Sequence, residues 1–380
     1  MEAWVADEDF GVYGCVGAAA PVEELLERLC SVDAECRIEA AREIRWLTKT
    51  SSKNRRQLAG AVGQLVSMLQ SESQEGAQAA ILALLNLAVK DERNKVKIVQ
   101  AGALYSLCDF MKSSDSNLQE YATTSLLTLS ASSLNKTTIC AAGAIPLLIM
   151  VLTDGTPQAK VDAAAALFNL STVKENLNSI LSSHPIPAII SLLKTIKKSS
   201  KTAEKCCALL EFLLSFDEFS TAAALTSVEG GVLTVVEVLE EGSVVSKEHA
   251  VGTLLTMCKS DRKRYREVIL NEGVIPGLLE LTVQGTPTAQ AKARELLQLL
   301  RESPYPRREL QADTLDNIVY NIVSRIDGDD KMGVTMAKKM LAEMVQVSME
   351  QSLRHLQQRA FVYTPADLPL GSCNSQVSLK

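Results

Sequence analysis

The chain has 380 residues, enough for two or three domains of ordinary size, and 47% of them are hydrophobic while only 4% are aromatic. Glycine and proline are scarce, at 19 and 11 residues. This excludes collagen-like, Pro/Gly-rich disordered and disulfide-scaffold proteins, and it disfavours an all-β fold, which needs more turn residues and aromatic side chains. The net charge of -6 provides no basic surface for nucleic acid, which binds mainly through its phosphates. We therefore expect a helical protein that binds no nucleic acid.

The cysteines and histidines form no pattern that is typical of a metal or catalytic site. The nine cysteines are scattered without a Cys-x-x-Cys pair, and the three histidines lie far apart in the sequence. We therefore expect reduced thiols, no catalytic residue, no metal and no cofactor. The first twenty residues lack the basic start of a secretory signal, and no window has the roughly 20 apolar residues of a membrane span. The sequence predicts a soluble protein without a membrane span.

A short apolar phrase recurs along the chain. It reads Gly-Ala-Ile-Pro-Leu-Leu in its clearest copy, and its successive starts lie 42, 41, 41, 46 and 43 residues apart. The starts are Gly60, Gly102, Gly143, His184, Gly230 and Gly273. A second phrase, such as the Ala-Ala-Ala-Ala-Leu-Phe-Asn-Leu-Ser of residues 163–171, follows each first one after a polar break. Such regular spacing indicates an internal structural repeat.

One repeat shows how the local signals divide it into helices. Asn135 is the predicted N-cap of a short helix over 137–142, which ends at Gly143, the residue type best able to adopt the left-handed conformation after a helix. Pro146 suits the first turn of a second helix because that turn does not need its missing N–H. The polar break at 153–157 separates this helix from a third. Each repeat is therefore predicted to contain one short and two long helices.

The third helix shows why the repeats must stack. Its small residues, Ala163 to Ala166, let neighbouring helices approach closely, and Leu167, Phe168 and Leu170 supply core. A unit of this size cannot bury its apolar faces alone, so successive units must share one continuous core. The predicted fold class is an all-α α-solenoid.

The phrases at 142–148, 154–171 and 285–301 resemble the armadillo repeat, and most closely that of plant U-box ubiquitin ligases. The resemblance covers about residues 22–303. It implies a right-handed α-solenoid of about seven armadillo repeats, in a plant protein of the cytoplasm, the nucleus or both. The U-box, which docks the ubiquitin-conjugating enzyme, has no counterpart, since only 21 residues precede the first repeat. We therefore expect no ligase activity from this chain.

The resemblance implies a non-enzymatic adaptor that binds a protein partner, in plant signalling or in ubiquitin-linked regulation. Two alternatives remain open: the substrate-recognition component of a ubiquitin ligase and, less favoured, a nuclear transport adaptor. The transport receptors of this fold use a Trp four positions before the Asn of the Leu-x-Asn-Leu phrase. Leu82 and Ala165 occupy those positions here, which disfavours the transport function.

In armadillo proteins the third helices line a concave groove, and the Asn of Leu-x-Asn-Leu faces it. The residues at this position are Trp46, Asn86, Thr128, Asn169, Leu213, Thr256 and Gln298, so the row of Asn is interrupted. Side chains four or seven positions earlier share the same helix face. The predicted partner-binding residues are Asn86, Tyr121, Thr124, Thr128, Asp162, Asn169 and His249.

Several of these residues have a purely structural alternative. Asn86 and Asn169 could brace adjacent helices instead, because buried amides are normally hydrogen-bonded. Tyr121 is favoured as a partner contact, since amphipathic aromatic side chains often anchor a partner. The basic cluster at 262–266 is open between a surface for an acidic partner, a nuclear-localisation signal, and solvated loops and helix caps, of which the last is favoured.

The repeat pattern stops after residue 303. Apolar residues then recur at helical spacing: Leu310, Leu315, Ile318, Val319, Ile322, Val323 and Ile326. A second, Met-rich helix is predicted at about 336–359. We expect residues 304–362 to form helices that cap the last repeat, because a terminal repeat exposes an apolar face. Residues 1–21 and 363–380 are expected to be flexible.

Overall fold

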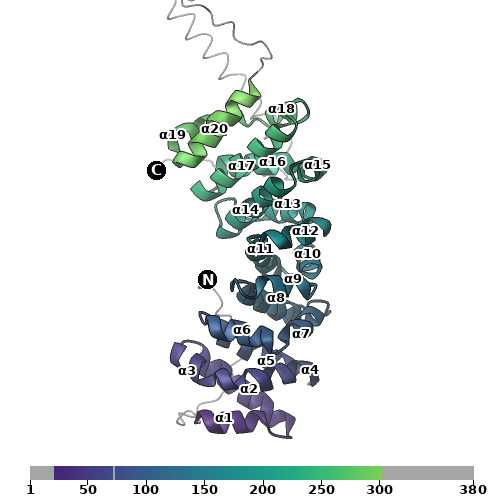
Figure 1. The fold of residues 1–380 in the computed structure, drawn as a ribbon, viewed down its shortest axis with the longest axis vertical. Coiled ribbons are helices and arrows are strands. Elements are labelled where there is room, and N and C mark those ends of the chain that lie inside the picture. The colour runs from purple at the N-terminus through teal and green to yellow at the C-terminus, as the bar shows by residue number, and fades with distance from the viewer. Residues whose placement is uncertain (1–20, 72, 302–380) are drawn as a thin grey trace, which may run out of the picture. The chain divides into compact units, whose positions relative to one another are not determined.

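The computed structural model describes residues 21–71 and 73–301 (Figure 1). In these residues all regular structure is helical, and no strand occurs among them. The predicted cap at 304–362 and tail at 363–380 lie outside the described residues, as does the N-terminal segment up to residue 20. The chain forms two compact units, which divide between Thr234 and Val235.

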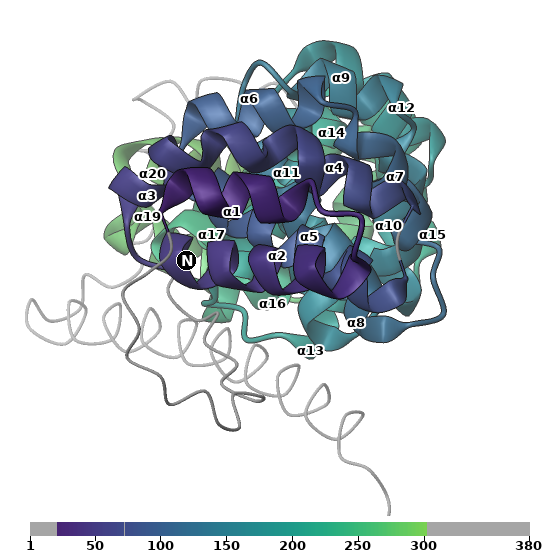
Figure 2. The same cartoon turned by 90° about the horizontal axis from the view of Figure 1, so that it is seen from below.

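The described part of the first unit begins with a helix pair and continues with three-helix repeats. The pair, α1 (Val22–Leu29) and α2 (Ala34–Thr48), lies side by side in Figure 2. Four repeats follow in chain order: α3 (Ser52–Gln57) with the 3-10 turn η1 (Leu58–Ala61), α4 (Val62–Ser71) and α5 (Gln74–Ala88); α6 (Glu92–Gln100), α7 (Ala103–Phe110) and α8 (Ser116–Ser130); α9 (Lys136–Ala141), α10 (Ala144–Asp154) and α11 (Pro157–Ser171); and α12 (Lys174–Ser182), α13 (Ile186–Thr195) and α14 (Lys201–Phe216). The helix α15 (Glu218–Ser227) starts the next repeat.

The unit boundary falls inside α16 (Gly231–Glu241). The described part of the second unit then contains four further elements: α17 (Val244–Ser260), α18 (Arg262–Asn271), α19 (Ile275–Gln284) and α20 (Pro287–Leu300). These helices repeat the order of the first unit, a first helix, a second helix and a third. The predicted three-helix repeat and the all-α fold are confirmed.

The joints between helices follow the predicted chemistry in most places. Gly143 has a φ of 77° and lies between α9 and α10, as expected of a left-handed residue after a helix. Third helices begin with a side-chain cap: the Thr156 hydroxyl, for example, accepts a hydrogen bond of 3.1 Å from the backbone N–H of Ala159. Pro157 takes the first helical position of α11.

The core of the first unit runs from repeat to repeat. Its third helices pack on one another in sequence, α2 on α5, α5 on α8, α8 on α11 and α11 on α14. Ala163 to Ala166 and Leu167 are buried as predicted. Phe168, which was expected in the core, is only half-buried, because its ring lies at the edge where α11 meets α14.

Candidate functional site

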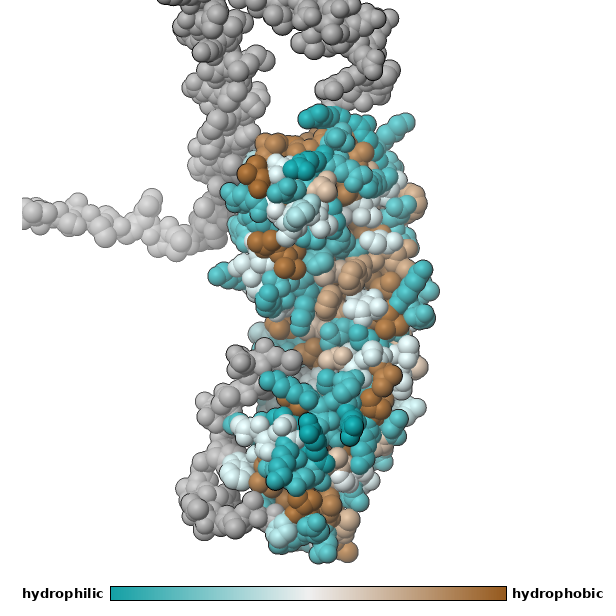
Figure 3. Space-filling model, turned by 60° about the vertical axis from the view of Figure 1, so that its left-hand side comes forward, coloured by the Kyte–Doolittle hydropathy of each residue, from teal (hydrophilic) through white to brown (hydrophobic). Residues whose placement is uncertain are grey.

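Half-exposed side chains of four consecutive third helices form the candidate binding surface of the first unit (Figure 3 shows the hydropathy of one side of the molecule). We call this surface the third-helix face; it consists of Leu85, Asn86, Tyr121, Leu127, Thr128, Phe168, Asn169 and Phe212. They come from α5, α8, α11 and α14, each of which packs on the next. Each of these four helices therefore contributes at least one half-exposed side chain to the third-helix face.

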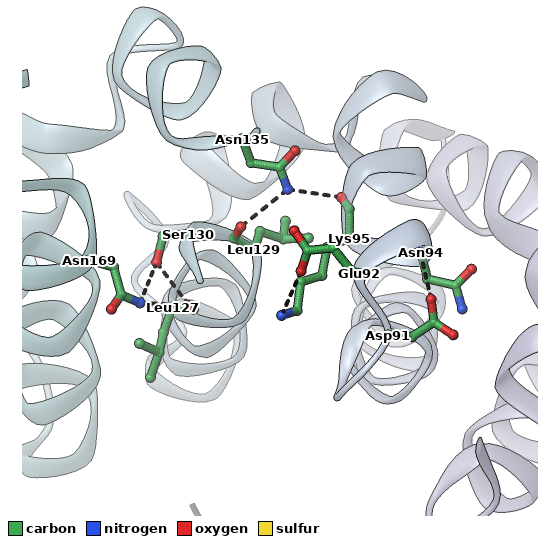
Figure 4. Close-up of polar contacts among 9 residues, drawn as sticks. All are labelled: Asp91, Glu92, Asn94, Lys95, Leu127, Leu129, Ser130, Asn135 and Asn169. Carbon is green, nitrogen blue, oxygen red and sulfur yellow. Dashed lines mark hydrogen bonds and ion pairs between the residues drawn. The ribbon is translucent and has the colours of Figure 1, made fainter. Parts of the chain in front are cut away.

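The amides of Asn86 and Asn169 both hold the preceding repeat. Asn86 Nδ2 donates to the backbone carbonyl of Arg45 over 2.8 Å, and Asn169 Nδ2 donates to Ser130 Oγ over 3.1 Å and to the Leu127 carbonyl over 3.5 Å (Figure 4). The bracing alternative therefore describes both side chains. Both are also half-exposed, so contact with a partner stays a prediction.

Tyr121 and Thr128 differ in how they are held. The Thr128 hydroxyl donates to the Thr124 carbonyl of its own helix over 3.0 Å, so this position makes no bond to the preceding repeat. Tyr121 is half-exposed on α8, and its phenol makes no hydrogen bond within the part of the chain that the structure describes. The Tyr121 ring is therefore the predicted site residue that the protein itself constrains least.

Thr124 and Asp162 were expected on the binding surface, but both are buried, with 7% and 4% of their surface exposed. The Thr124 hydroxyl donates to Asp162 Oδ2 over 2.6 Å, and Gln158 Nε2 donates to Asp162 Oδ1 over 3.0 Å. Burial raises the pKa of Asp162; the two hydrogen bonds oppose that rise, and the nearby carboxylate of Glu120 adds to it. The pair thus joins α8 to α11 inside the protein, because the packing of these helices covers this side of α11.

His249 lies in a different unit from the other predicted residues. It lies half-exposed on α17, in the second unit. Its backbone carbonyl accepts a hydrogen bond of 3.0 Å from the Thr253 hydroxyl. The candidate site described for the first unit therefore does not include His249.

A second row of amides was missed by the sequence reasoning. Asn135 occupies the predicted N-cap position of α9, but its side chain makes no capping bond. Instead, Asn135 Nδ2 donates to the carbonyls of Lys95 and Leu129 over 3.1 and 3.2 Å (Figure 4). Asn94 and Asn176 are equally buried and do the same in their repeats. We call the series Asn54, Asn94, Asn135 and Asn176 the amide ladder.

The acceptors of the amide ladder follow one rule. The first acceptor is the Leu that follows the Leu-x-Asn-Leu position in the preceding third helix: Leu47, Leu87, Leu129 and Leu170. From Asn94 onward, the second acceptor is the residue after the previous ladder Asn: Arg55, Lys95 and Lys136. The signal was present in the sequence, since the last three ladder residues stand eight positions before the repeat starts at 102, 143 and 184.

Aromatic side chains on third helices were also missed. Phe168 of α11 and Phe212 of α14 stack with ring centroids 6.1 Å apart and an interplanar angle of 14°. Trp46 of α2 is 66% exposed, although it occupies the position of the groove Asn. Large half-exposed rings of this kind are common anchors in protein interfaces. Their occurrence at neighbouring positions of the third helices was a signal that the sequence contained.

Two arginines of the basic cluster of α18 cap a helix end. Arg262 donates from Nε to the Leu299 carbonyl and from a terminal nitrogen to the Arg301 carbonyl, each over 2.6 Å, and Arg266 Nε donates to the Leu300 carbonyl over 2.9 Å. These carbonyls form the C-terminal end of α20, where the helix dipole favours positive charge. Two of the five residues at 262–266 are thus cap residues.

The cysteine thiols and the possible metal ligands of the described residues are the remaining candidates for chemistry. All seven described cysteines are free, and burial raises the pKa of the Cys206 thiol to about 12, so this thiol stays protonated and unreactive. Among residues 21–71 and 73–301 no group of three or more His, Cys, Asp or Glu side chains could hold a metal ion. No single helix in these ranges is long and apolar enough to cross a membrane; α15 and α16 reach that limit only as a sharply bent pair.

Comparison with known proteins places the chain in a family. The family described as "Plant U-box protein ARM repeat region" matches residues 21–317. U-box domain-containing protein 17 of Arabidopsis thaliana is 31% identical over 320 residues, which are 83% of this chain and 42% of that protein. The E3 ubiquitin-protein ligase SPL11 of Oryza sativa subsp. japonica is 39% identical over 75 residues, 19% of this chain and 11% of the ligase. The chain thus spans less than half the length of these curated relatives.

A solved structure supports the fold alone. The crystal structure of an engineered protein superposes with a TM-score of 0.64 at 21% identity, over 88% of this chain and 78% of that one. The helix order, the shared core and the family match agree with one another. The chain belongs to the family of plant U-box protein armadillo repeat regions.

Proposed function

We propose that the third-helix face binds an extended segment of a protein partner, so that the chain acts as a non-enzymatic adaptor. The observation that carries this proposal is the stacked pair Phe168 and Phe212, half-exposed beside Asn169 on a face to which every repeat between 74 and 216 contributes. The armadillo repeat of its family is a protein-interaction fold. Aromatic rings fixed by a neighbouring helix present apolar area at little entropic cost to the complex.

The amides of the face suit a peptide backbone. Each Asn side chain has two N–H donors and one carbonyl oxygen. In Asn86 and Asn169 the nitrogen is directed to the preceding repeat, which fixes the orientation of the side chain and leaves Oδ1 as an acceptor. An extended partner segment offers backbone N–H groups at regular intervals. The rings would bind side chains of that segment while the fixed carbonyl oxygens accept its N–H groups.

The test is a selection of binding peptides followed by matched variants. Purified chain is used to select peptides from a displayed library of plant protein segments, and the affinity of the best peptide is measured by calorimetry. We expect Tyr121→Ala and Phe212→Ala each to weaken binding by about tenfold or more. The control is Tyr105→Ala, which removes a 73% exposed tyrosine from the second helix α7 and should change the affinity by less than about twofold. Equal effects of Tyr105→Ala and Tyr121→Ala would contradict the proposal.

A second candidate function is the substrate-recognition part of a ubiquitin ligase. The family and the names of the relatives favour it. In a reaction with purified activating enzyme, conjugating enzyme and ubiquitin, the chain alone should form no ubiquitin conjugates. Fusion of a U-box to its N-terminus should then direct ubiquitin to the protein that carries the selected peptide. Conjugate formation by the chain alone would show that it is an enzyme and overturn the adaptor proposal.

A further inference from the structure

One position of the second helix distinguishes the last described repeat from the others. Six residues after each repeat start, the side chain is buried in five repeats: Val66, Cys108, Ile149, Ile190 and Val236 are exposed by 8% or less. In α19 the same position is Leu279, which is 53% exposed. Second helices of successive repeats pack on each other, as α4 does on α7 and α10 on α13. Leu279 therefore lies on a side of the helix that is covered elsewhere.

A second position, ten residues after the repeat start, differs in its chemistry. The other second helices have polar residues there: Gln70, Lys112, Thr153, Lys194 and Glu240. The residue in α19 is Val283, which is 76% exposed. Together with the exposed Pro276, Leu279 and Val283 follow the spacing of three and four residues that places side chains on one helix face. We call Pro276, Leu279 and Val283 the α19 stripe.

The α19 stripe points away from the preceding repeat. The opposite side of α19 packs on α16, since a Cβ at Gly277 would lie 3.3 Å from Leu239 Cδ2. Leu279 follows Gly277 by two residues, which is about 200° around the helix. The α19 stripe thus faces the side on which further chain would stack.

The neighbouring third helix does not continue that apolar surface. Ala164 and Ala165 of α11 are buried, but the matching residues of α20, counted from the first proline of each helix, are the exposed Arg294 and Glu295. Burying these charges under another complete repeat would be costly. The surface offered by α19 and α20 together therefore fits a single amphipathic helix on α19 and not a further three-helix repeat.

We propose that residues 310–326 of the same chain form this helix and dock on the α19 stripe. Their apolar residues are Leu310, Leu315, Ile318, Val319, Ile322, Val323 and Ile326. From 315 to 326 these residues are separated alternately by three positions and by one. This spacing places them on one apolar side of a helix. Residues 315–326 would extend about 18 Å and the ten residues of α19 about 15 Å, so the two surfaces match in length.

The connection permits this docking. The third helix α20 returns along α19, because only two residues join them, and it ends at Leu300 near the start of α19. Eight residues, 302–309, separate Arg301 from Leu310 and span up to about 26 Å when extended. A tether of this length keeps the segment at high effective concentration beside the stripe. The family match, which runs to residue 317, continues into the segment.

Hydrogen exchange of the full chain tests the proposal. In the unchanged chain, backbone amides of 315–326 should exchange about tenfold more slowly than those of an unstructured peptide of the same sequence. The double variant Leu279→Asp with Val283→Asp should abolish this protection. The control makes the same change in charge at two exposed positions of α20, Ala291→Asp with Gln298→Asp, and should keep it. Exchange within α17 verifies that the repeats remain folded.

Two further measurements keep the test decisive. If the double variant unfolds α19, the variant Ile318→Asp with Ile322→Asp replaces it; this change lies outside the repeats and should accelerate exchange in α19 when docking is lost. Sedimentation velocity identifies a different occupant. A dimer in the unchanged chain that dissociates in the Leu279→Asp and Val283→Asp variant would show that a second copy covers the stripe. That result, or unprotected amides at 315–326 in the unchanged chain, would overturn the proposal.

Discussion

The amide ladder of the first unit and the arginines of the second unit satisfy the ends of third helices by different chemistry. In the first unit, buried Asn side chains reach back to the third helix of the repeat before. In the second unit, Arg262 and Arg266 reach forward to α20 of their own repeat, and the ladder position holds Tyr265, which is buried as a large ring. The Asn residues couple neighbouring repeats, whereas the arginines join the first and third helices of one repeat.

The largest effect is expected from breaking the ladder. Asn135→Ala removes two hydrogen bonds and leaves the carbonyls of Lys95 and Leu129 without that donor in a buried place. We expect a loss of about 2–3 kcal/mol, since two buried hydrogen bonds are lost together, while the Leu129 carbonyl still accepts from the backbone N–H of Ser132. The loss should appear in hydrogen exchange of α6 and α9 together, because the ladder couples two repeats. Asn117→Ala, at an exposed position of α8, is the control. A loss confined to α9 would contradict the coupling role.

The arginines should give a smaller and more local effect. Arg262→Ala with Arg266→Ala leaves the last carbonyls of α20 to water, and we expect α20 to lose about 1–2 kcal/mol of local stability. The measurement is amide exchange in α20, with Lys263→Ala, an exposed neighbour, as the matched variant. Loosening that spreads equally to α17 would show that the arginines also couple neighbouring repeats and would remove the contrast with the ladder.

A change at a repeat start should stabilise the first unit. His184 has a φ of 53°, a left-handed conformation that strains a residue with a Cβ. The equivalent Gly143 has a φ of 77° without strain. We expect His184→Gly to raise the free energy of unfolding by about 1 kcal/mol and Gly143→Ala to lower it by a similar amount. Urea unfolding of the two variants measures both; a destabilising His184→Gly would show that the imidazole makes a contact worth more than the strain.

The smallest effect concerns the buried carboxyl of Asp162 and depends on pH. Its pKa is raised in the folded protein, so the unfolded chain ionises it at lower pH. The protonated carboxyl therefore contributes its full stabilisation of the folded protein at a pH below the unfolded pKa. This stabilisation is lost as the pH rises through the folded pKa. Asp162→Asn should be more stable than the unchanged chain at neutral pH, and this gain should disappear in acid. Thermal unfolding at both pH values measures it. A gain that persists unchanged in acid would exclude ionisation as its cause.

The sequence was sufficient to predict what depends on neighbouring residues. Gly143, Pro146 and the capping Thr156 act within their own turn or helix, and the repeat, its three helices and the all-α fold were predicted from such signals. Asn135 does take the N-cap position of α9, but its side chain does not cap that helix, because its amide binds the carbonyl of Lys95, 40 residues away.

The candidate site was predicted less well for a related reason. Helical spacing placed Thr124 on the helix face of Thr128 and Asp162 on that of Asn169, but it does not show which part of such a face a neighbouring repeat covers. The packing of α8 on α11 buries both. The half-exposed Phe168 shows the opposite error, since an aromatic residue amid alanines and leucines was expected inside.

The regular geometry of the amide ladder has a consequence for how such a chain can change in length. From Asn94 to Asn135 and from Asn135 to Asn176 the step is 41 residues, and each amide meets the same two kinds of carbonyl. If residues 95–135 were deleted, Asn94 would take the place of Asn135, and Asn176 would find equivalent acceptors in the repeat before it. Whole repeats are interchangeable at these joints, so duplication or loss of one leaves no buried amide without a partner. The ladder thus makes the first unit modular, and the step of 46 residues after His184 marks where that modularity ends.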